Sequence, residues 1–378
     1  GAPKTEPGEP FSLELPIELI VNDATATNIQ VSSGEDRFDI ERVALAGQLA
    51  GSDLKITRLV AESELGNLAA TASGRLSDRY DADASVTWNL RLPDQPAMSG
   101  RLRVRGNAAE YDVNHELRAP YSILTDGKLS LSGGNLEFEL TNSWRSIDIA
   151  AGDDRSINLG DGNLRLVGDI DAFSYEIRSN LRTADVPPLV VTSVGTLVAD
   201  SLAIDALSVW SDHGRLSASG QISTADEFPW ELAFDLADLD PSLADARLGG
   251  SVDARGTSRG RITDGRPVAI VEIDDLAGAL NGFKVDGSAD LAYADNRLKI
   301  ENAIIEVGDN VARFNAGFGT DLQLDAALEL AELAQLGFDL SGSLNGNIRA
   351  ATNFEALEIE GTLSGANVAW RDYSAAQL

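Results

Sequence analysis

The sequence of 378 residues contains no cysteine and only two histidines, His115 and His213. Without cysteine the chain has no disulfide framework, no thiolate nucleophile and no cysteine-based metal site. Neither histidine has a histidine partner at the spacing that a zinc site uses, and His213 is expected to be a solvated turn residue. Acid–base chemistry would then depend on aspartate and glutamate alone, and no pair of these residues has a sequence spacing that marks it as catalytic. We therefore expect no catalytic residue, no metal and no cofactor.

Long apolar runs are also missing. No stretch approaches the roughly 18 to 20 residues that a membrane-spanning helix needs, and no signal peptide is present. Residues 1–10 are interpreted as a flexible lead-in or a remnant of cloning, so the chain is expected to be a piece of a longer protein. No proline-rich or serine-rich linker divides the rest, and residues 11–378 are therefore predicted to form one continuous β-repeat segment.

Basic residues are scarce, because 30 lysines and arginines face 60 aspartates and glutamates, for a net charge of −30. Binding of a nucleic acid needs a concentrated basic surface, so this class of partner is excluded. The acidic residues are interpreted as a solvated outer face that keeps an extended β protein soluble and guards its edges. Residues 256–267 are the one locally basic stretch and are predicted to be a loop.

The feature around which the chain is organised is an alternation of apolar and polar residues between Leu202 and Ile222. Leu202 and Ile204 are two residues apart, as expected for one face of a strand. The alternation then shifts by one residue and resumes at Leu207. Residues 212–214 supply the turn chemistry, and the return arm alternates again. This pattern predicts an amphipathic β-hairpin with one apolar face.

Copies of this hairpin pattern begin at Leu54, Leu129 and Leu298, at irregular spacing. Imperfect repeats of short alternating strands are typical of neighbours that stack side by side into one elongated body.

Three local features are also predicted. Residues 11–31 are expected to form two strands that are broken near Asn22–Asp23. A strand from Trp230 is expected to end at Asp240–Pro241, and a strand from Leu322 to Leu330 is expected to be followed by a helical turn.

The repeated apolar face has to be covered, since a soluble monomer rarely exposes an apolar patch of more than a few hundred Å². A closed barrel of so many strands would be wide and unfilled. Two arrangements remain open: a solenoid or sandwich whose walls touch, or a trough filled by something apolar. Small residues at inward phases, such as Ala70, Ala72 and Gly74, favour the trough. Each methylene moved from water onto such a surface gains roughly 0.8 kcal/mol.

The predicted fold is therefore all-β, an elongated and curved sheet that forms an open, solenoid-like groove with a hydrophobic interior and few or no helices. Its lining is predicted to include inward apolar residues from every repeat. These residues are Leu54, Ile56, Trp88, Leu90, Leu136, Phe138, Leu202, Ile204, Leu232, Phe234, Ile305, Phe314, Leu324 and Leu328.

Several motifs together resemble the periplasmic part of the TamB family, a component of the translocation and assembly module within the AsmA-like, bridge-like lipid transfer proteins. They are the arm PWELAFDLADLDPSL from Pro229 to Leu243 and the glycine-led segments that start at Gly100, Gly250 and Gly342. The absence of cysteine and the acidic balance agree with the resemblance.

The resemblance implies a β-taco, a long curved sheet with an apolar inner wall, in the periplasm of a Gram-negative bacterium. It also implies phospholipids as cargo, moved toward the outer membrane, and support of outer-membrane protein assembly with a TamA-type barrel. The family's inner-membrane anchor is expected to lie outside this sequence, as is the segment that contacts the barrel.

Two other functions remain open on the sequence. One is a structural or adhesive β-repeat scaffold with a dry core. The other is a β-solenoid enzyme acting on polysaccharide, which would require a carboxylate cluster on one outer face.

Overall fold

The computed structural model describes residues 14–33, 36–77, 79–93, 95–132, 135–150, 156–183, 187–243, 245–263, 265–352, 357–370 and 373–377. Over these ranges the chain forms 25 strands and two short 3₁₀-helices, and no α-helix. The predicted all-β class is confirmed. Among the same residues, no helix is long and apolar enough to cross a membrane.

The chain divides into two compact units, Gly1–Pro188 and Leu189–Leu378, here called unit 1 and unit 2. The strands of unit 1 are β1 (Leu15–Ser33), β2 (Asp36–Gly51), β3 (Asp53–Ser63), β4 (Gly66–Arg75), β5 (Ala82–Leu90), β6 (Met98–Asn107), β7 (Glu110–Ala119), β8 (Ile123–Ser132), β9 (Asn135–Trp144), β10 (Ile147–Ala150), β11 (Ser156–Asp169) and β12 (Ala172–Arg182). Unit 2 contains β13 (Leu189–Val198), β14 (Ser201–Ser211), β15 (Gly214–Ser223), β16 (Trp230–Leu239), η1 (Pro241–Leu243), β17 (Gly250–Thr263), β18 (Arg266–Leu280), β19 (Phe283–Ala294), β20 (Arg297–Val307), β21 (Asn310–Phe318), β22 (Leu322–Leu330), η2 (Leu333–Leu336), β23 (Leu340–Thr352), β24 (Leu357–Trp370) and β25 (Tyr373–Gln377). The prediction of one continuous segment stays a prediction.

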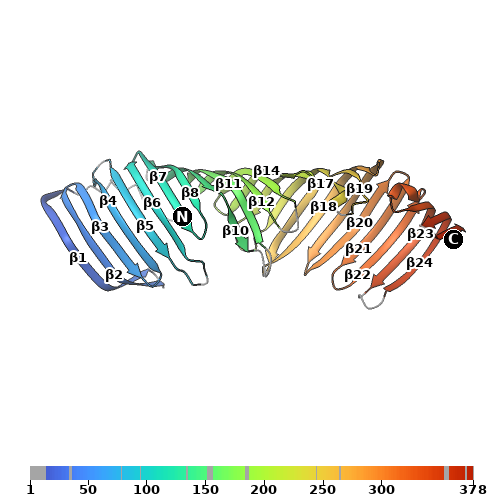
Figure 1. The fold of residues 1–378 in the computed structure, drawn as a ribbon, viewed down its shortest axis with the longest axis horizontal. Helices are drawn as coiled ribbons and strands as arrows, with labels where there is room; N and C mark the ends of the chain where they lie inside the picture. Colours follow the sequence, from blue (N-terminus) through green and yellow to red (C-terminus); the bar gives the residue numbers. More distant parts are fainter. Residues whose placement is uncertain are drawn as a thin grey trace, which may run out of the picture. The chain divides into compact units, whose positions relative to one another are not determined.

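Within each unit the strands pair antiparallel with their neighbours along the chain, mostly through short turns (Figure 1). The exception is β11, whose first residues pair with β10 and whose later residues pair with β9. Side chains alternate across each strand, and in β4 every second residue is exposed while those between are half-buried. Each sheet therefore has two chemically different faces.

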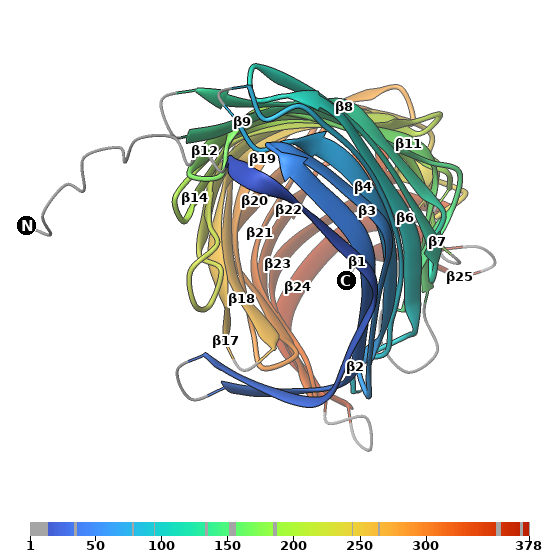
Figure 2. The same cartoon turned by 90° about the vertical axis from the view of Figure 1, so that its left-hand side faces the viewer.

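The predicted slip in the alternation after Ile204 is confirmed as a β-bulge in β14. Ile204 pairs with Gly220, whereas the next inward residue, Leu207, pairs with Ala218. Equivalent shifts follow Ile56 in β3 and other first arms of the repeats. A bulge bends its strand and increases its twist, so a series of bulges curls a sheet. Figure 2 shows the strands of unit 1 bowed in this way.

Two sequence-based predictions are wrong for the same physical reason. Asn22–Asp23 does not separate two strands, because β1 runs through it and absorbs the extra residue as a register shift between Val21 and Ala24. Residues 256–267 are mostly strand and not a loop, since β17 continues to Thr263 and its hairpin partner β18 begins at Arg266. In both places, residues typical of turns are accommodated without loss of strand pairing.

The strand from Trp230 and the helical turn after Leu330 are both confirmed, as β16 and η2. Asn310, only 1% exposed, holds η2 in place. Its Nδ2 donates to the carbonyl oxygens of Val307 and Glu332, both at 3.0 Å, and its Oδ1 accepts from the Glu332 N–H at 3.0 Å. Leu333 of η2 is buried beside it.

A second fixed point of unit 2 is the loop between η1 and β17. The Arg247 guanidinium donates to Asp245, with Nη2 at 2.6 Å from Oδ2, and lies 5.0 Å from the centre of the Phe338 ring. Hydrogen bonds from the Arg247 side chain, and then from its backbone N–H, lower the pKa of Asp245 from 3.8 to about 2. The charged carboxylate is therefore the form that stabilises this loop.

This lowered pKa predicts a pH-dependent contribution to stability. Because the folded-state pKa lies below the unfolded value, the contribution is present above about pH 4 and is lost as the pH falls toward 2. Asp245→Asn should lower the melting temperature by about 1–2 °C at pH 7 and leave it unchanged near pH 2. Thermal melts followed by circular dichroism test this, with the exposed Asp226→Asn as control. An equal loss at both pH values would contradict the assignment.

Candidate functional site

The strand register of unit 1 places the predicted lining residues on one face, called here the inner face. Paired residues on adjacent antiparallel strands point to the same side of a sheet. Leu68 pairs with Trp88 and Trp88 with Gly100, and the same rule extends row by row as far as β9. The predicted residues on this face are Leu54, Ile56, Trp88, Leu90, Leu136 and Phe138.

The register of unit 2 gives the same result. Gly220 pairs with Leu232, Ala218 with Phe234, and Ala316 with Leu324, so that small and large residues alternate across the strands. The predicted residues that share the inner face of unit 2 are Leu202, Ile204, Leu232, Phe234, Ile305, Phe314, Leu324 and Leu328.

These side chains are sheltered to different degrees. Ile204 is 8% exposed and Leu136 is 39% exposed, while the other predicted residues are half-buried. In Figures 1 and 2 each unit is a single layer of strands. A single layer leaves the inner face partly open to a ligand.

Tryptophan residues lie across glycine residues on both inner faces. A Cβ atom added to Gly100, Gly162 or Gly260 would lie 2.7, 2.5 or 2.4 Å from the ring of Trp88, Trp144 or Trp230, respectively. Each glycine thus lets an indole ring from the adjacent strand lie down over the backbone, an arrangement known to support glycine in sheets. The Trp230 Nε1–H also donates to Ser258 Oγ at 3.1 Å.

The inner face of unit 1 holds a cavity of about 260 Å³ beside Trp88. Its apolar lining comes from Ile40, Leu68, Trp88 and Leu90, which belong to β2, β4 and β5. The volume is slightly below the usual range of small-molecule sites, so this cavity suits part of a chain-like ligand better than a whole compact one.

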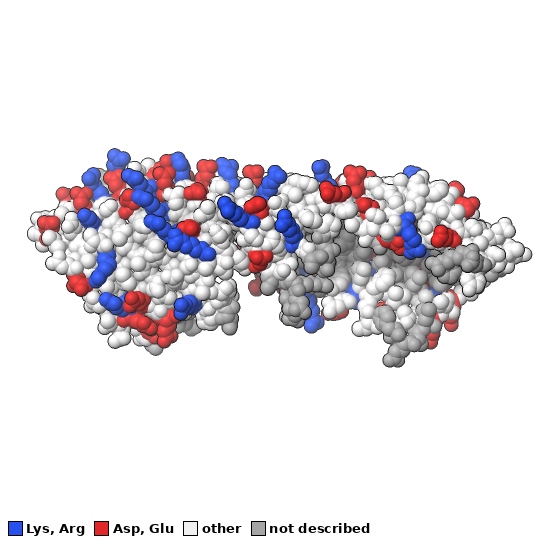
Figure 3. Space-filling view, viewed as in Figure 1, with Lys and Arg blue, Asp and Glu red and all other residues white. Residues whose placement is uncertain are grey.

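The opposite face of unit 1, called here the outer face, carries alternating charges. One cross-strand row reads Asp83, Arg105, Asp112, Lys128, Glu139, Arg165 and Glu176. Figure 3 shows basic and acidic side chains side by side on the viewer-facing surface of unit 1, and Figure 2 shows the strands of unit 1 bowed toward that surface. The outer face is therefore convex and the inner face is concave.

The ion pairs of the outer face are close but solvated. Arg165 lies 2.7 Å from Glu139, and its hydrogen bond to this carboxylate, more than their Coulomb attraction, lowers the pKa of Glu139. Such exposed pairs contribute little to stability. They keep the outer face wet and discourage pairing with other sheets.

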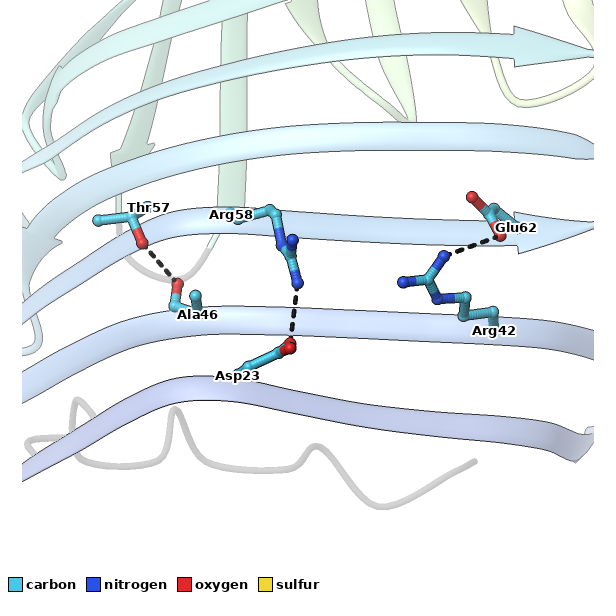
Figure 4. Close-up of polar contacts among 6 residues, drawn as sticks. All are labelled: Asp23, Arg42, Ala46, Thr57, Arg58 and Glu62. Carbon is cyan, nitrogen blue, oxygen red and sulfur yellow. Dashed lines mark hydrogen bonds and ion pairs between the residues drawn. The ribbon is translucent and has the colours of Figure 1, made fainter.

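The bulge in β3 adds to this outer face (Figure 4). It turns both Thr57 and Arg58 outward, where Thr57 Oγ1 donates to the Ala46 carbonyl oxygen at 3.1 Å. Arg58 reaches across β2 to Asp23 of β1, with 2.8 Å between Nη2 and Oδ1. This bulge thus bends the sheet and places two polar side chains on its convex side.

Three arginines in or directly before the stretch predicted to be a basic loop belong to the same pattern. Arg255 lies 2.9 Å from Asp235 and Arg259 lies 2.8 Å from Glu272. Arg261 contacts Glu227 at 3.6 Å. These cations are neutralised by acids on adjacent elements.

A polar row on the inner face of unit 1 was not predicted. His115, Thr125 and Asn142 are successive cross-strand neighbours on β7, β8 and β9. A signal is present in the sequence, since His115 stands in phase with Tyr111 and Val113.

His213 lies in the turn between β14 and β15, as expected, but it is half-buried and its Nδ1 lies 3.3 Å from Asp240 Oδ2. Hydrogen bonds from Ser242, followed by the one from His213, lower the pKa of Asp240. Over the described ranges, no group of three or more histidine, cysteine or acidic residues could hold a metal ion.

Bowed antiparallel sheets with an apolar concave face and a charged convex face define an open, groove-forming all-β protein. The family model described as the TamB N-terminal domain matches residues 6–378 of this chain. The chain belongs to the TamB N-terminal domain family, as the sequence motifs predicted. A search of the solved structures finds no match.

Proposed function

We propose that this chain carries phospholipids, with their acyl chains against the inner faces of its two units, in the periplasm of a Gram-negative bacterium. In this proposal the complete protein is anchored in the inner membrane and moves the lipids toward the outer membrane. It also supports outer-membrane protein assembly together with a TamA-type barrel. Membership in the TamB family supports the transport and assembly role.

The observation that carries the proposal is the continuity of apolar rows on a face without a second layer. Ala72, Ala84, Val104 and Val113 form one such row on four successive strands. Hydrocarbon placed on this surface gains roughly 25 cal/mol for each Å² removed from water, whatever the headgroup. The surface therefore suits lipid cargo of varied headgroups.

The two alternatives fit less well. A scaffold with a dry core needs its inner residues interlocked with a second layer, whereas Leu136 and its cross-strand neighbour Leu131 are both exposed. A polysaccharide-active enzyme needs a cluster of carboxylates free to act. The row of outer-face carboxylates in unit 1 instead alternates with arginine and lysine, as in the pair Glu139–Arg165. In unit 2 the neighbouring carboxylates Glu272, Asp290 and Glu301 are bound by Arg259, Asn302 and Lys299, respectively.

The direct test is mass spectrometry of lipids that co-purify with the chain. The chain purified from a Gram-negative host without detergent should carry phospholipid, in an amount of at least about one molecule per chain. The matched control is a soluble, acidic all-β protein of similar size taken through the same steps. Lipid at the level of this control would contradict the proposal.

A further inference from the structure

The polar row of unit 1 lies in otherwise apolar surroundings. His115 pairs with Leu102 of β6 on one side and with Thr125 of β8 on the other. Asn142 of β9 follows Thr125, and Leu164 of β11 ends the row. Three groups able to form hydrogen bonds thus cross the concave face side by side.

Two of the three groups are already satisfied. Thr125 Oγ1 donates to Asn142 Oδ1 at 2.7 Å, and Asn142 Nδ2 donates to the Leu164 carbonyl oxygen at 3.3 Å. The His115 imidazole has no hydrogen bond or ion pair with any described residue. Its contact is with Trp88, whose ring lies parallel to it, with 6.0 Å between ring centres and 4° between planes. Gly100, on the strand between them, gives the indole room to reach this position.

No carboxylate faces His115 from the elements packed around it. The inner-face neighbours Val113 and Leu117 of β7 and Leu102 of β6 are apolar. The nearest titratable group on this face is Tyr111, whose hydroxyl donates to the Tyr80 carbonyl oxygen at 2.6 Å.

The charged residues beside His115 along the chain and across the strands lie on the outer face. They are Arg101, Arg103, Glu116 and Asp126. Glu116 is hydrogen-bonded there by Arg118 at 2.7 Å. An anion at His115 would therefore meet no opposing acid on the inner face.

We propose that His115, stacked on Trp88, is a docking point for the phosphodiester oxygen of a phospholipid whose tail lies on the neighbouring apolar residues. This inference rests on the proposed lipid-carrying function. A neutral imidazole donates one N–H to such an oxygen, and a protonated imidazole donates two and adds Coulomb attraction. Lipids would then be held more firmly at this point when the surroundings are acidic.

The test compares two probes with the same tail, oleoyl lysophosphatidylglycerol and monooleoylglycerol, below their micellar concentrations. Binding to the whole chain is measured by calorimetry at pH 5.5 and pH 8, with circular dichroism to verify folding. The phosphodiester probe should bind about threefold to tenfold more tightly at pH 5.5, because the phosphodiester keeps its charge while imidazole gains one. The uncharged probe should bind equally at both pH values.

Matched variants assign the effect. His115→Gln should abolish the pH dependence and His213→Gln, at the other histidine, should keep it. Glycerol 3-phosphate at the same concentration should not compete; competition would indicate a free-anion site and overturn the lipid assignment.

Equal binding of the two probes, or an unchanged pH effect in His115→Gln, would overturn this inference and leave the proposed function standing. If neither probe binds, the proposed function fails and this inference fails with it.

Discussion

Replacing Phe234 by aspartate should slow the transfer of phospholipid between vesicles by at least about tenfold. Phe234 lies on β16 between the small residues Ala218 and Gly256, so its ring is the bulky apolar group at that point of the inner face. A carboxylate at this point keeps its water, and hydrocarbon that passes it must remove that water. Leaving an ionised group unpaired in apolar surroundings costs several kcal/mol, and each 1.4 kcal/mol is a factor of ten.

The control for this prediction is the exposed Glu231, which lies three residues earlier on the other face of β16. Glu231→Ala should leave the transfer rate unchanged, and Phe234→Ala should reduce it by less than the aspartate variant. A second pair, Phe314→Asp with Arg313→Ala, tests the same reasoning on β21, where Phe314 faces inward and Arg313 outward. Equal effects from inward and outward changes would show that the inner face carries no lipid.

Much of the fold could be predicted from local alternation. The slip between Ile204 and Leu207 is visible in the sequence as a change of phase, because a bulge shifts every later side chain by one position. A bulge also occurs at Asn22–Asp23, but the alternation of apolar residues shows no clear change of phase there. In the sequence this site therefore resembles a break between two strands. Whether a polar pair ends a strand or bulges out of it depends on the neighbouring strand, which local sequence does not specify.

The large apolar residues of the inner face could be predicted from the sequence more completely than Gly260 and His115, whose roles depend on neighbouring strands. Leu232 and Phe234 identify themselves by alternation with polar residues. Gly260 does not, because glycine within a run such as residues 256–265 is also the signature of a loop. Its role depends on Trp230, some thirty residues earlier, whose ring needs the space. His115 was missed for a related reason, since its neighbours in space lie on other strands.

The tryptophan and glycine couples also determine how the concave surface is built. A side chain on each glycine would lift the indole ring from the sheet and narrow the inner face. With glycine, the rings of Trp88 and Trp144 lie over the backbone of the next strand and present a broad apolar surface. The cost is that these positions tolerate almost no substitution.

Gly162→Ala should therefore reduce the free energy of unfolding of unit 1 by about 2–3 kcal/mol, as expected for overpacking at a tight site. The added Cβ would lie 2.5 Å from Trp144 Cζ2 and 2.8 Å from the Arg178 carbonyl oxygen. Trp144 is only 9% exposed, so its ring has little room to move away. Urea unfolding followed by circular dichroism measures the loss. Gly160→Ala, two residues earlier in β11, is the matched control and should change stability by no more than about 0.5 kcal/mol, since its Cβ comes no closer than 3.3 Å to a neighbour.

A double-mutant cycle separates the ring from the backbone as the source of this loss. Trp144→Ala alone should cost about 3–5 kcal/mol, because a buried indole is removed. In that background Gly162→Ala should cost at least about 1 kcal/mol less than in the wild-type chain, since only the approach to Arg178 remains. Residues in contact are expected to couple in this way, whereas independent sites add. An equal cost of Gly162→Ala in both backgrounds would contradict this prediction. It would show that glycine is needed at position 162 only because of the close backbone of Arg178, and not to make room for the Trp144 ring.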